Sequence, residues 1–453
     1  MAEAVRGPAA QRRLPLGLVA VAVWTCVLAW FVIQGSDLLW VVALGDVTRS
    51  GGGVPTSLPF ASAPQAEWHN PIVLAELLLS LVHALGPAGL AALQLVVVAV
   101  TLVVLLAEGR RLGGSEGRCA LVLSLVVVGA SAHLVITRLP SLSLVPYVLA
   151  LAVMRRQHDR PSLAVWWLVP IYLVWGNLHG GVLVGLAVLG VFLVASPGGG
   201  PVLRRAGVGL GCALTLVLTS AGLRTPAYYV SALGNEAAAR GTDLWARPSL
   251  GQPLDVVMIV AAVVLVVLAV RARPPLWEWL AVAGLVLGAA SAGRNAVWLL
   301  LFLAPAAMRM RVPARTAPAV TIRPAAAAVA TVVVVAVAAT ALVVRGPAVE
   351  APGSAVVEAV RAAAGGRPVL ASEPLAETLA QAGVTVWAAN PIDAFPRDVQ
   401  GQFLDFLHDG TVPDEPAIGL VVVAADAAAA VAADGDWIPG PPLDGYVLLT
   451  PAP

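Results

Sequence analysis

Eleven long apolar runs divide this chain, and they limit what it can fold into more than any other feature of its sequence. Hydrophobic residues make up 59% of the 453 residues and charged residues only 12%, whereas a soluble globular protein carries about 25% charged residues. Most of the surface must therefore meet lipid. Because backbone groups in lipid have no water to bond, each run must form a helix. The sequence predicts an α-helical polytopic membrane protein.

The expected membrane helices are placed by the length of each apolar run and by the Gly, Pro and Arg residues that flank it. The first run follows arginines, as in a signal peptide, but it can span the bilayer core and no small-residue cleavage site ends it. We therefore expect it to be the first of about 11 membrane helices. These cover roughly residues 14–34, 88–107, 119–137, 141–154, 162–176, 182–196, 207–222, 254–270, 276–292, 296–309 and 324–345.

The arginines predict the orientation of these helices in an inner (plasma) membrane. If the N-terminus is cytoplasmic, every cytoplasmic segment carries at least two arginines, as the positive-inside rule expects. Those segments are 12–13, 110–118, 155–160, 204–205, 271–273 and 309–323. The outer side then holds residues 35–87, the turn at Arg138, residues 177–181, 223–253 and 293–295, and the C-terminus.

Residues 346–453 regain charged and turn-forming residues after the transmembrane part, residues 1–345. Short β-type runs at 368–371, 384–388, 418–423 and 446–450 alternate with helical stretches near 376–382, 399–407 and 425–433. This alternation predicts a small extracytoplasmic α/β domain with partly parallel strands. No glycine-rich phosphate loop follows its first strand. A net charge of +1 gives no reason to expect nucleic acid as a partner.

The first external segment, residues 35–87, is longer than connections without a function usually are. Asp37 directly follows the first helix, where a carboxylate at the membrane boundary can deprotonate an acceptor hydroxyl. Asp46 is the competing candidate for this base. The alternative interpretation is a loop whose tryptophans anchor it at headgroup depth, and a Glu76 that simply lies on an exposed helix face. The other candidate ligand-binding residues of the segment are Trp40, Trp68, His69 and Glu76.

Further candidates lie at three other outer turns. Arg138 and Arg294 lie on the outer side, against the general arginine bias, and a guanidinium group matches phosphate oxygens in a bidentate manner. Their alternative role is to reach the outer lipid headgroups. Asn177 and His179 lie among glycines that would let the backbone approach a ligand, although a structural turn is equally compatible. No residue spacing demands a metal, but the outer acids could hold a divalent ion.

Several of these motifs resemble a bacterial group of integral-membrane glycosyltransferases of the GT-C type. The resemblance implies that a sugar passes from a polyprenyl-phosphate donor to a cell-envelope glycan or lipid acceptor on the outer face. It also implies that Asp37 or Asp46 is the acidic base and that outer arginines hold the donor phosphate. The similar stretches are Asp37-Leu38-Leu39-Trp40 with Gly45, Pro55, Phe60 and 68–76, then Arg138-Leu139-Pro140, Trp-Gly-Asn-Leu-His-Gly-Gly at 175–181, Arg294-Asn295 and, weakly, Asn390-Pro391-Ile392-Asp393.

Two other functions stay open at this point. The first is a non-catalytic envelope protein whose C-terminal domain binds a partner or a glycan. The second is a transporter. Against a transporter, the sequence shows neither an inverted repeat nor a pair of acidic residues in the middle of a span, where coupling ions would bind.

Overall fold

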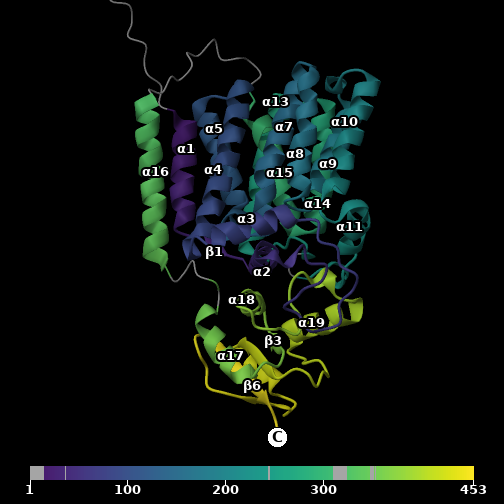
Figure 1. Cartoon of the computed structure of the whole chain (residues 1–453). Coiled ribbons are helices and arrows are strands. Elements are labelled where there is room, and N and C mark those ends of the chain that lie inside the picture. The colour runs from purple at the N-terminus through teal and green to yellow at the C-terminus, as the bar shows by residue number, and fades with distance from the viewer. Residues whose placement is uncertain (1–14, 36, 243–244, 310–323, 347–350, 352) are drawn as a thin grey trace, which may run out of the picture.

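The computed structural model describes residues 15–35, 37–242, 245–309, 324–346, 351 and 353–453. The chain forms a bundle of helices with a smaller α/β layer at one end (Figure 1). Two of the expected cytoplasmic segments, residues 12–13 and nearly all of 309–323, lie outside the described residues.

Each apolar run that was expected to form a membrane helix contains a helix. Four described helical stretches are long and apolar enough to cross a membrane: Ala88–Arg111, Leu139–Asp159, Pro253–Ala272 and Ala328–Arg345. A fifth arises if Val202–Leu218 and Gly222–Arg240, bent by 112°, count as one span. Six further apolar helices have 10–17 residues. The bundle helices are α1 (Leu16–Ala29), α4 (Pro87–Arg111), α5 (Glu116–Gly129), α6 (Ser131–Leu134), α7 (Leu144–Asp159), α8 (Leu168–Gly176), α9 (Val182–Ala195), α10 (Val202–Leu214), α13 (Pro253–Ala272), α14 (Leu276–Ser291), α15 (Ala296–Met308) and α16 (Pro324–Arg345).

The helices differ widely in how deeply they are packed. Every residue of α15 is buried, which places this helix at the centre of the bundle. By contrast, α16 lies at one edge beside α1 (Figure 1) and only 11% of its apolar window is buried. Arg345 fixes its end, because the guanidinium donates to the carbonyls of Ala29 (3.3 Å) and Val32 (2.6 Å). Carbonyls at a helix C-terminus lack partners within the helix, so this contact ties the last helix to the first.

Short helices of the external segments cover the end of the bundle that faces the α/β layer (Figure 1). In the first external segment these are α2 (Leu39–Val47) and α3 (Val73–His83), and α3 lies across the bundle. The two helices meet closely, since a Cβ at Gly45 would overlap the backbone carbonyl of Glu76. The segment after α10 forms α11 (Thr225–Leu233) and α12 (Glu236–Arg240).

The C-terminal layer is built on a mixed sheet in the order β3-β4-β6-β5. The pair β3–β4 is parallel, whereas β4–β6 and β5–β6 are antiparallel, so the partly parallel sheet is as predicted. The strand expected at 384–388 is wrong, because Val386 forms only isolated bridges to Val369 and Ala61. The elements are α17 (Val357–Ala364), β3 (Val369–Ala371), α18 (Leu375–Gln381), α19 (Arg397–Asp409), β4 (Leu420–Ala424), α20 (Ala428–Val431), β5 (Trp437–Pro439) and β6 (Tyr446–Pro451).

The first external segment supplies backbone partners to this C-terminal layer. The N–H of Val386 donates to the carbonyl of Phe60, and the N–H of Ser62 donates back to the carbonyl of Val386, both at 2.9 Å. Ala63 and Ala66 donate in the same way to residues 387 and 394. The layer therefore completes its hydrogen bonding with residues that lie more than 300 positions earlier in the chain.

Candidate functional site

A short parallel pairing at the end of the bundle brings Asp37 beside Arg138. The strand β1 (Ile33–Gln34) follows α1 and pairs with β2 (Ile136–Thr137), and the N–H of Gly35 extends the pairing to the carbonyl of Thr137 at 2.9 Å. Glycine is needed there, because a Cβ would lie 2.8 Å from Cγ of Arg138. Just beyond the pairing, Nε of Arg138 donates to Oδ1 of Asp37 at 3.3 Å. Both side chains are 19% exposed.

A second guanidinium group, that of Arg294, lies near this ion pair. Arg294 belongs to η8 (Gly293–Asn295), the turn between α14 and α15. Burial and the nearby charge of Arg138 lower the pKa of Arg294 to about 10, whereas Asp37 acts in the opposite direction. The ring of Trp245 packs against it, with its centroid 3.4 Å from Cζ, a cation–π contact. Within the part of the chain that the structure describes, no acceptor takes a hydrogen bond from this guanidinium.

Among the described residues, Asp37 is the one carboxylate that pairs with Arg138 and also acts on Arg294, so the two guanidinium groups outnumber it. A site of this kind favours an anion with several oxygens, because planar guanidinium groups donate to phosphate or carboxylate oxygens in parallel. The burial of Arg294 strengthens the effect, since charges interact more strongly where water is excluded.

His179 lies near Arg294 and is held by a chain of hydrogen bonds in the turn between α8 and α9. Its Nδ1 accepts from the N–H of Gly181 at 2.9 Å and lies 2.9 Å from Oγ of Ser143. Ser143 in turn accepts from Nε1 of Trp175 at 2.8 Å. Because Nδ1 is an acceptor, the neutral ring carries its proton on Nε2. Burial and then the charge of Arg294 lower the pKa of His179 to about 3, so the ring stays neutral.

The two candidate bases lie at opposite ends of α2. This helix has 9 residues, and at 1.5 Å per residue its ends are roughly 13 Å apart. Asp46 accepts a hydrogen bond from Oγ of Ser80 at 2.5 Å, and Nη1 of Arg49 lies 3.5 Å from the same carboxylate oxygen. Only Asp37 lies beside Arg138 and near Arg294.

Glu76 is buried in α3, which overturns the alternative of an exposed-face glutamate. Nδ2 of Asn70 donates to its Oε1 at 2.8 Å, while its Oε2 has no hydrogen-bond partner among the described residues. Burial raises the pKa of Glu76 to about 7, although the hydrogen bond from Asn70 opposes this. Its polar contact is with Asn70 rather than with Asp37 or the two arginines.

The remaining predicted ligand-binding residues are engaged by the protein itself. Trp40 and Trp68 are buried, at 6% and 2% exposed. His69 lies 3.6 Å from Glu67. The side-chain amides of Asn177 and Asn295 donate to backbone carbonyls, at 2.9 Å to Leu173 and at 3.1 Å to Gly288.

Sequence reasoning missed several residues of the cluster around Arg294. His133 hydrogen-bonds to the backbone of Arg294 and lies near Arg138 and Asp255. Trp245 packs on the guanidinium, and Ser143 holds His179. The sequence signal for His133 and Ser143 was their place near the outer ends of predicted spans, and that for Trp245 was its place in the outer segment 223–253.

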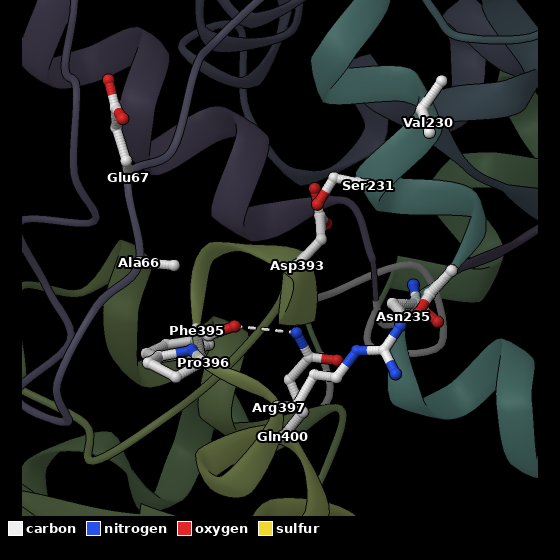
Figure 2. Close-up of a pocket in the computed structure, with 11 residues that line it drawn as sticks. Ala66, Glu67, Val230, Ser231, Asn235, Asp393, Phe395, Pro396, Arg397 and Gln400 are labelled. Atoms are coloured by element: carbon white, nitrogen blue, oxygen red, sulfur yellow. Dashed lines mark hydrogen bonds between the residues drawn. The ribbon is translucent and has the colours of Figure 1, made fainter.

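A pocket of about 280 Å³ lies between the first external segment, the α11–α12 region and the C-terminal layer (Figure 2). Its lining includes Glu67, Ser231, Asp393 and Arg397. The described residues contain no group of three His, Cys, Asp or Glu side chains that could hold a metal ion.

Comparison with known proteins gives a likeness at the level of the fold. No family model matches the sequence, and no curated protein matches it. The crystal structure of ArnT from Cupriavidus metallidurans bound to undecaprenyl phosphate is similar, with a TM-score of 0.52 and 16% sequence identity over 96% of this chain and 97% of that chain. Identity this low bears on the fold alone. The chain is a mostly helical membrane protein with a GT-C-like fold.

Proposed function

We propose that this chain is a glycosyltransferase that moves a sugar from a polyprenyl-phosphate donor to a cell-envelope glycan or lipid acceptor. The observation that carries the proposal is the pair of guanidinium groups, Arg138 and Arg294, that lie around the carboxylate of Asp37 at one end of the bundle. The likeness to a structure bound to undecaprenyl phosphate supports the same class of ligand.

The proposal includes the topology on which this chemistry depends. The chain would cross the inner (plasma) membrane about 11 times, with the N-terminus in the cytoplasm. Residues 1–345 would form the transmembrane domain and residues 346–453 an extracytoplasmic α/β domain. The arginine distribution supports this orientation, and the candidate site and the C-terminal layer lie at the same end of the bundle (Figure 1). The shorter helices would cross a locally thinned bilayer or together with their flanking turns.

The proposed reaction is a single displacement at the anomeric carbon of the donor sugar. The acceptor hydroxyl oxygen forms the new glycosidic bond while the bond from the anomeric carbon to the phosphate oxygen breaks, and polyprenyl phosphate leaves. Asp37 takes the proton of the acceptor hydroxyl as general base. Arg138 and Arg294 stabilise the charge that develops on the leaving phosphate. His179 offers its Nε2–H as a neutral hydrogen-bond donor beside them.

Because Asp37 is paired with Arg138 in this structure, the donor phosphate would compete with Asp37 for that guanidinium group. A phosphate that binds Arg138 would free one oxygen of Asp37 to accept a proton. The arrangement therefore links donor binding to exposure of the base.

The two acids of α2 provide a matched test. Asp37→Asn and Asp46→Asn remove the same charge from the two ends of one helix. In membranes supplied with a radiolabelled polyprenyl-phosphate sugar, we expect Asp37→Asn to lower the transfer rate at least about a hundred-fold. Asp46→Asn should change the rate little, since the described hydrogen-bond and ion-pair partners of Asp46 are Ser80 and Arg49, away from Arg138 and Arg294. Full activity of Asp37→Asn would refute the role of this residue as base.

A further inference from the structure

We propose that the pocket between the first external segment, α11–α12 and the C-terminal layer is a binding subsite for one neutral sugar ring of the acceptor. That the bound sugar belongs to the acceptor rests on the proposed function. That the pocket binds a sugar is argued from the pocket alone. The subsite is separate from the cluster of Asp37, Arg138 and Arg294, since none of these residues lines it.

The walls of this pocket are fixed to each other by contacts between distant segments. Nη2 of Arg397 donates to the carbonyl of Gly234 at 2.7 Å, and the N–H of Glu236 donates to Oε1 of Gln400 at 2.8 Å. Arg240 also pairs with Asp405 at 2.7 Å. These contacts hold α19 against α11 and α12, so the pocket is formed before a ligand arrives. A preformed site binds with a smaller loss of entropy.

Asp393 gives the pocket an unused acceptor. The hydroxyl of Tyr228 hydrogen-bonds to its carboxyl group, and burial raises its pKa. The second oxygen, Oδ2, is buried and has no hydrogen-bond partner among the described residues. Leaving a buried acceptor unpaired is costly. Because Oδ2 is closed to solvent in this structure, a ligand hydroxyl would pair with it after a small shift of the lining side chains. Ser231 lines the same pocket and offers a hydroxyl group (Figure 2).

The size and charge of the pocket favour a single neutral sugar. Its volume of about 280 Å³ is just below the range of roughly 300–1,000 Å³ of pockets for drug-sized ligands. Glu67 is already paired with Arg224 at 2.8 Å, which leaves Asp393 opposite one base of the lining, Arg397. The lining is therefore close to neutral, which suits an uncharged ligand. Val230 and Pro396 add apolar surface, which suits the C–H face of a sugar while the polar groups bind its hydroxyls.

Saturation-transfer NMR on the full-length protein in lipid nanodiscs tests this subsite. The probes are neutral methyl glycosides of hexoses and pentoses, with a methyl glucuronide as the anionic comparison. We expect saturation transfer to at least one neutral glycoside and a weaker signal from the glucuronide. Asp393→Asn should weaken the binding of the neutral glycoside about ten-fold, the equivalent of one hydrogen bond. Asp398→Asn, an exposed change in the first turn of the following helix α19, is the matched control and should bind as the unaltered protein does.

A second variant guards against misfolding of Asp393→Asn. Ser231 is exposed, so Ser231→Leu should fold normally while its larger side chain fills the pocket and blocks the glycoside. The proposal is overturned if no neutral glycoside binds, if the glucuronide binds better, or if Ser231→Leu binds as the unaltered protein does.

Donor turnover, measured on the same preparations as release of polyprenyl phosphate, separates this inference from the proposed function. If the unaltered protein binds a glycoside but never turns over a donor, the sugar subsite stands and the proposed transfer fails. If donor turnover is normal and depends on Asp37 but no glycoside binds, the transfer stands and the subsite fails. If both stand, Asp393→Asn should raise KM for the acceptor more than it lowers kcat.

Discussion

Two groups of arginines at opposite ends of the helix bundle differ in their charge partners. At the end away from the C-terminal layer, Arg155 is 1% exposed and pairs with Glu278 at 3.2 Å while it donates to the carbonyl of Phe302 at 2.7 Å. Other arginines at that end are also matched to carboxylates. These pairs are Arg110 with Glu116 (2.7 Å), Arg111 with Glu108 (2.8 Å) and Asp159 (2.6 Å), Arg156 with Glu108 (2.6 Å), and Arg309 with Glu278 (3.8 Å).

At the end that faces the C-terminal layer, Arg138 pairs with Asp37, and Asp37 is the one described carboxylate whose charge raises the pKa of Arg294. The difference separates two uses of the same side chain. Arginines whose N–H groups are bonded to carboxylates and carbonyls of the protein hold helices together. Arginines with unbonded N–H groups can bind a ligand anion. The comparison predicts that stability depends on the first group and ligand binding on the second.

Glu278→Gln should have the largest effect on stability. It leaves the buried guanidinium of Arg155 without its charge partner, and breaking a buried ion pair costs about 3–5 kcal/mol. We expect a marked fall in the apparent Tm of the protein in detergent. Glu358→Gln is the control, because this residue pairs with Arg361 at an exposed site, and should leave the Tm nearly unchanged. An unaltered Tm for Glu278→Gln would remove the distinction between the two ends.

Arg138→Gln and Arg294→Gln should show the opposite pattern. In the proposed reaction each variant loses a donor to the developing phosphate charge, a change that typically costs about a hundred-fold or more in rate. The transfer rate should fall by that factor, while the apparent Tm changes much less than it does for Glu278→Gln. Arg361→Gln, an exposed arginine of the C-terminal layer, is the control for both assays. If either site variant unfolds as readily as Glu278→Gln, its arginine is structural.

Glu76→Gln should change how stability depends on pH. The pKa of Glu76 is about 7 in the folded protein instead of 4.5, so the folded state keeps a proton that the unfolded state releases. Stability should therefore fall as the pH rises from about 4.5 to 7, by up to about 3 kcal/mol. Glutamine is neutral and can still accept from Asn70, so the variant should lose this slope and exceed the unaltered protein in stability above pH 7.

The measurement for Glu76 is the apparent Tm of both proteins between pH 4.5 and 8. Equal slopes for the two would show that Glu76 does not carry the proton. The result also tests whether α3 packs closely on α2, because burial in this contact is what raises the pKa of Glu76.

Ser143→Ala should have the smallest effect. It removes one hydrogen bond from His179 and one from Trp175, while the N–H of Gly181 still fixes the tautomer of His179. We expect the transfer rate to fall about ten-fold, the equivalent of one or two neutral hydrogen bonds. Ser291→Ala, at an exposed helix end, is the control. A rate equal to that of the unaltered protein would mean that His179 plays no part in the site.

The helices could be predicted from the sequence, because an apolar run of about 15–20 residues is stable in lipid only as a helix. The strands β3, β4 and β6 could be predicted from short apolar runs that lie between turn-forming residues. The prediction failed at 384–388, where Val386 bridges to Ala61 across the chain. A bridge between residues so far apart leaves no local pattern to detect.

The candidate site was predictable as a set of residues but not as an arrangement. Asp37 and Arg138 are 101 positions apart, and the pairing of β1 with β2 that joins them involves two residues in each strand. A strand of two residues is too short to show the alternation of polar and apolar residues by which strands are predicted. Likewise, Asp37 and Asp46 could be separated only once α2 was known to hold them at opposite ends.

The backbone hydrogen bonds between the first external segment and the C-terminal layer limit what a deletion of that layer can show. Deletion of residues 346–453 would leave Phe60, Ser62 and Ala63 without their backbone partners, so it would disturb the first external segment as well. Point variants are the cleaner tests of which part carries the function.

Binding of undecaprenyl phosphate to the full-length protein in nanodiscs tests the central claim most directly. The comparison is between the unaltered protein and the double variant Arg138→Gln, Arg294→Gln, with both preparations first shown to have similar Tm values. We expect the double variant to bind at least about a hundred-fold more weakly, because each guanidinium supplies a charge-assisted hydrogen bond to the phosphate. Equal affinity of the two proteins would contradict the claim that these arginines form the donor-phosphate site.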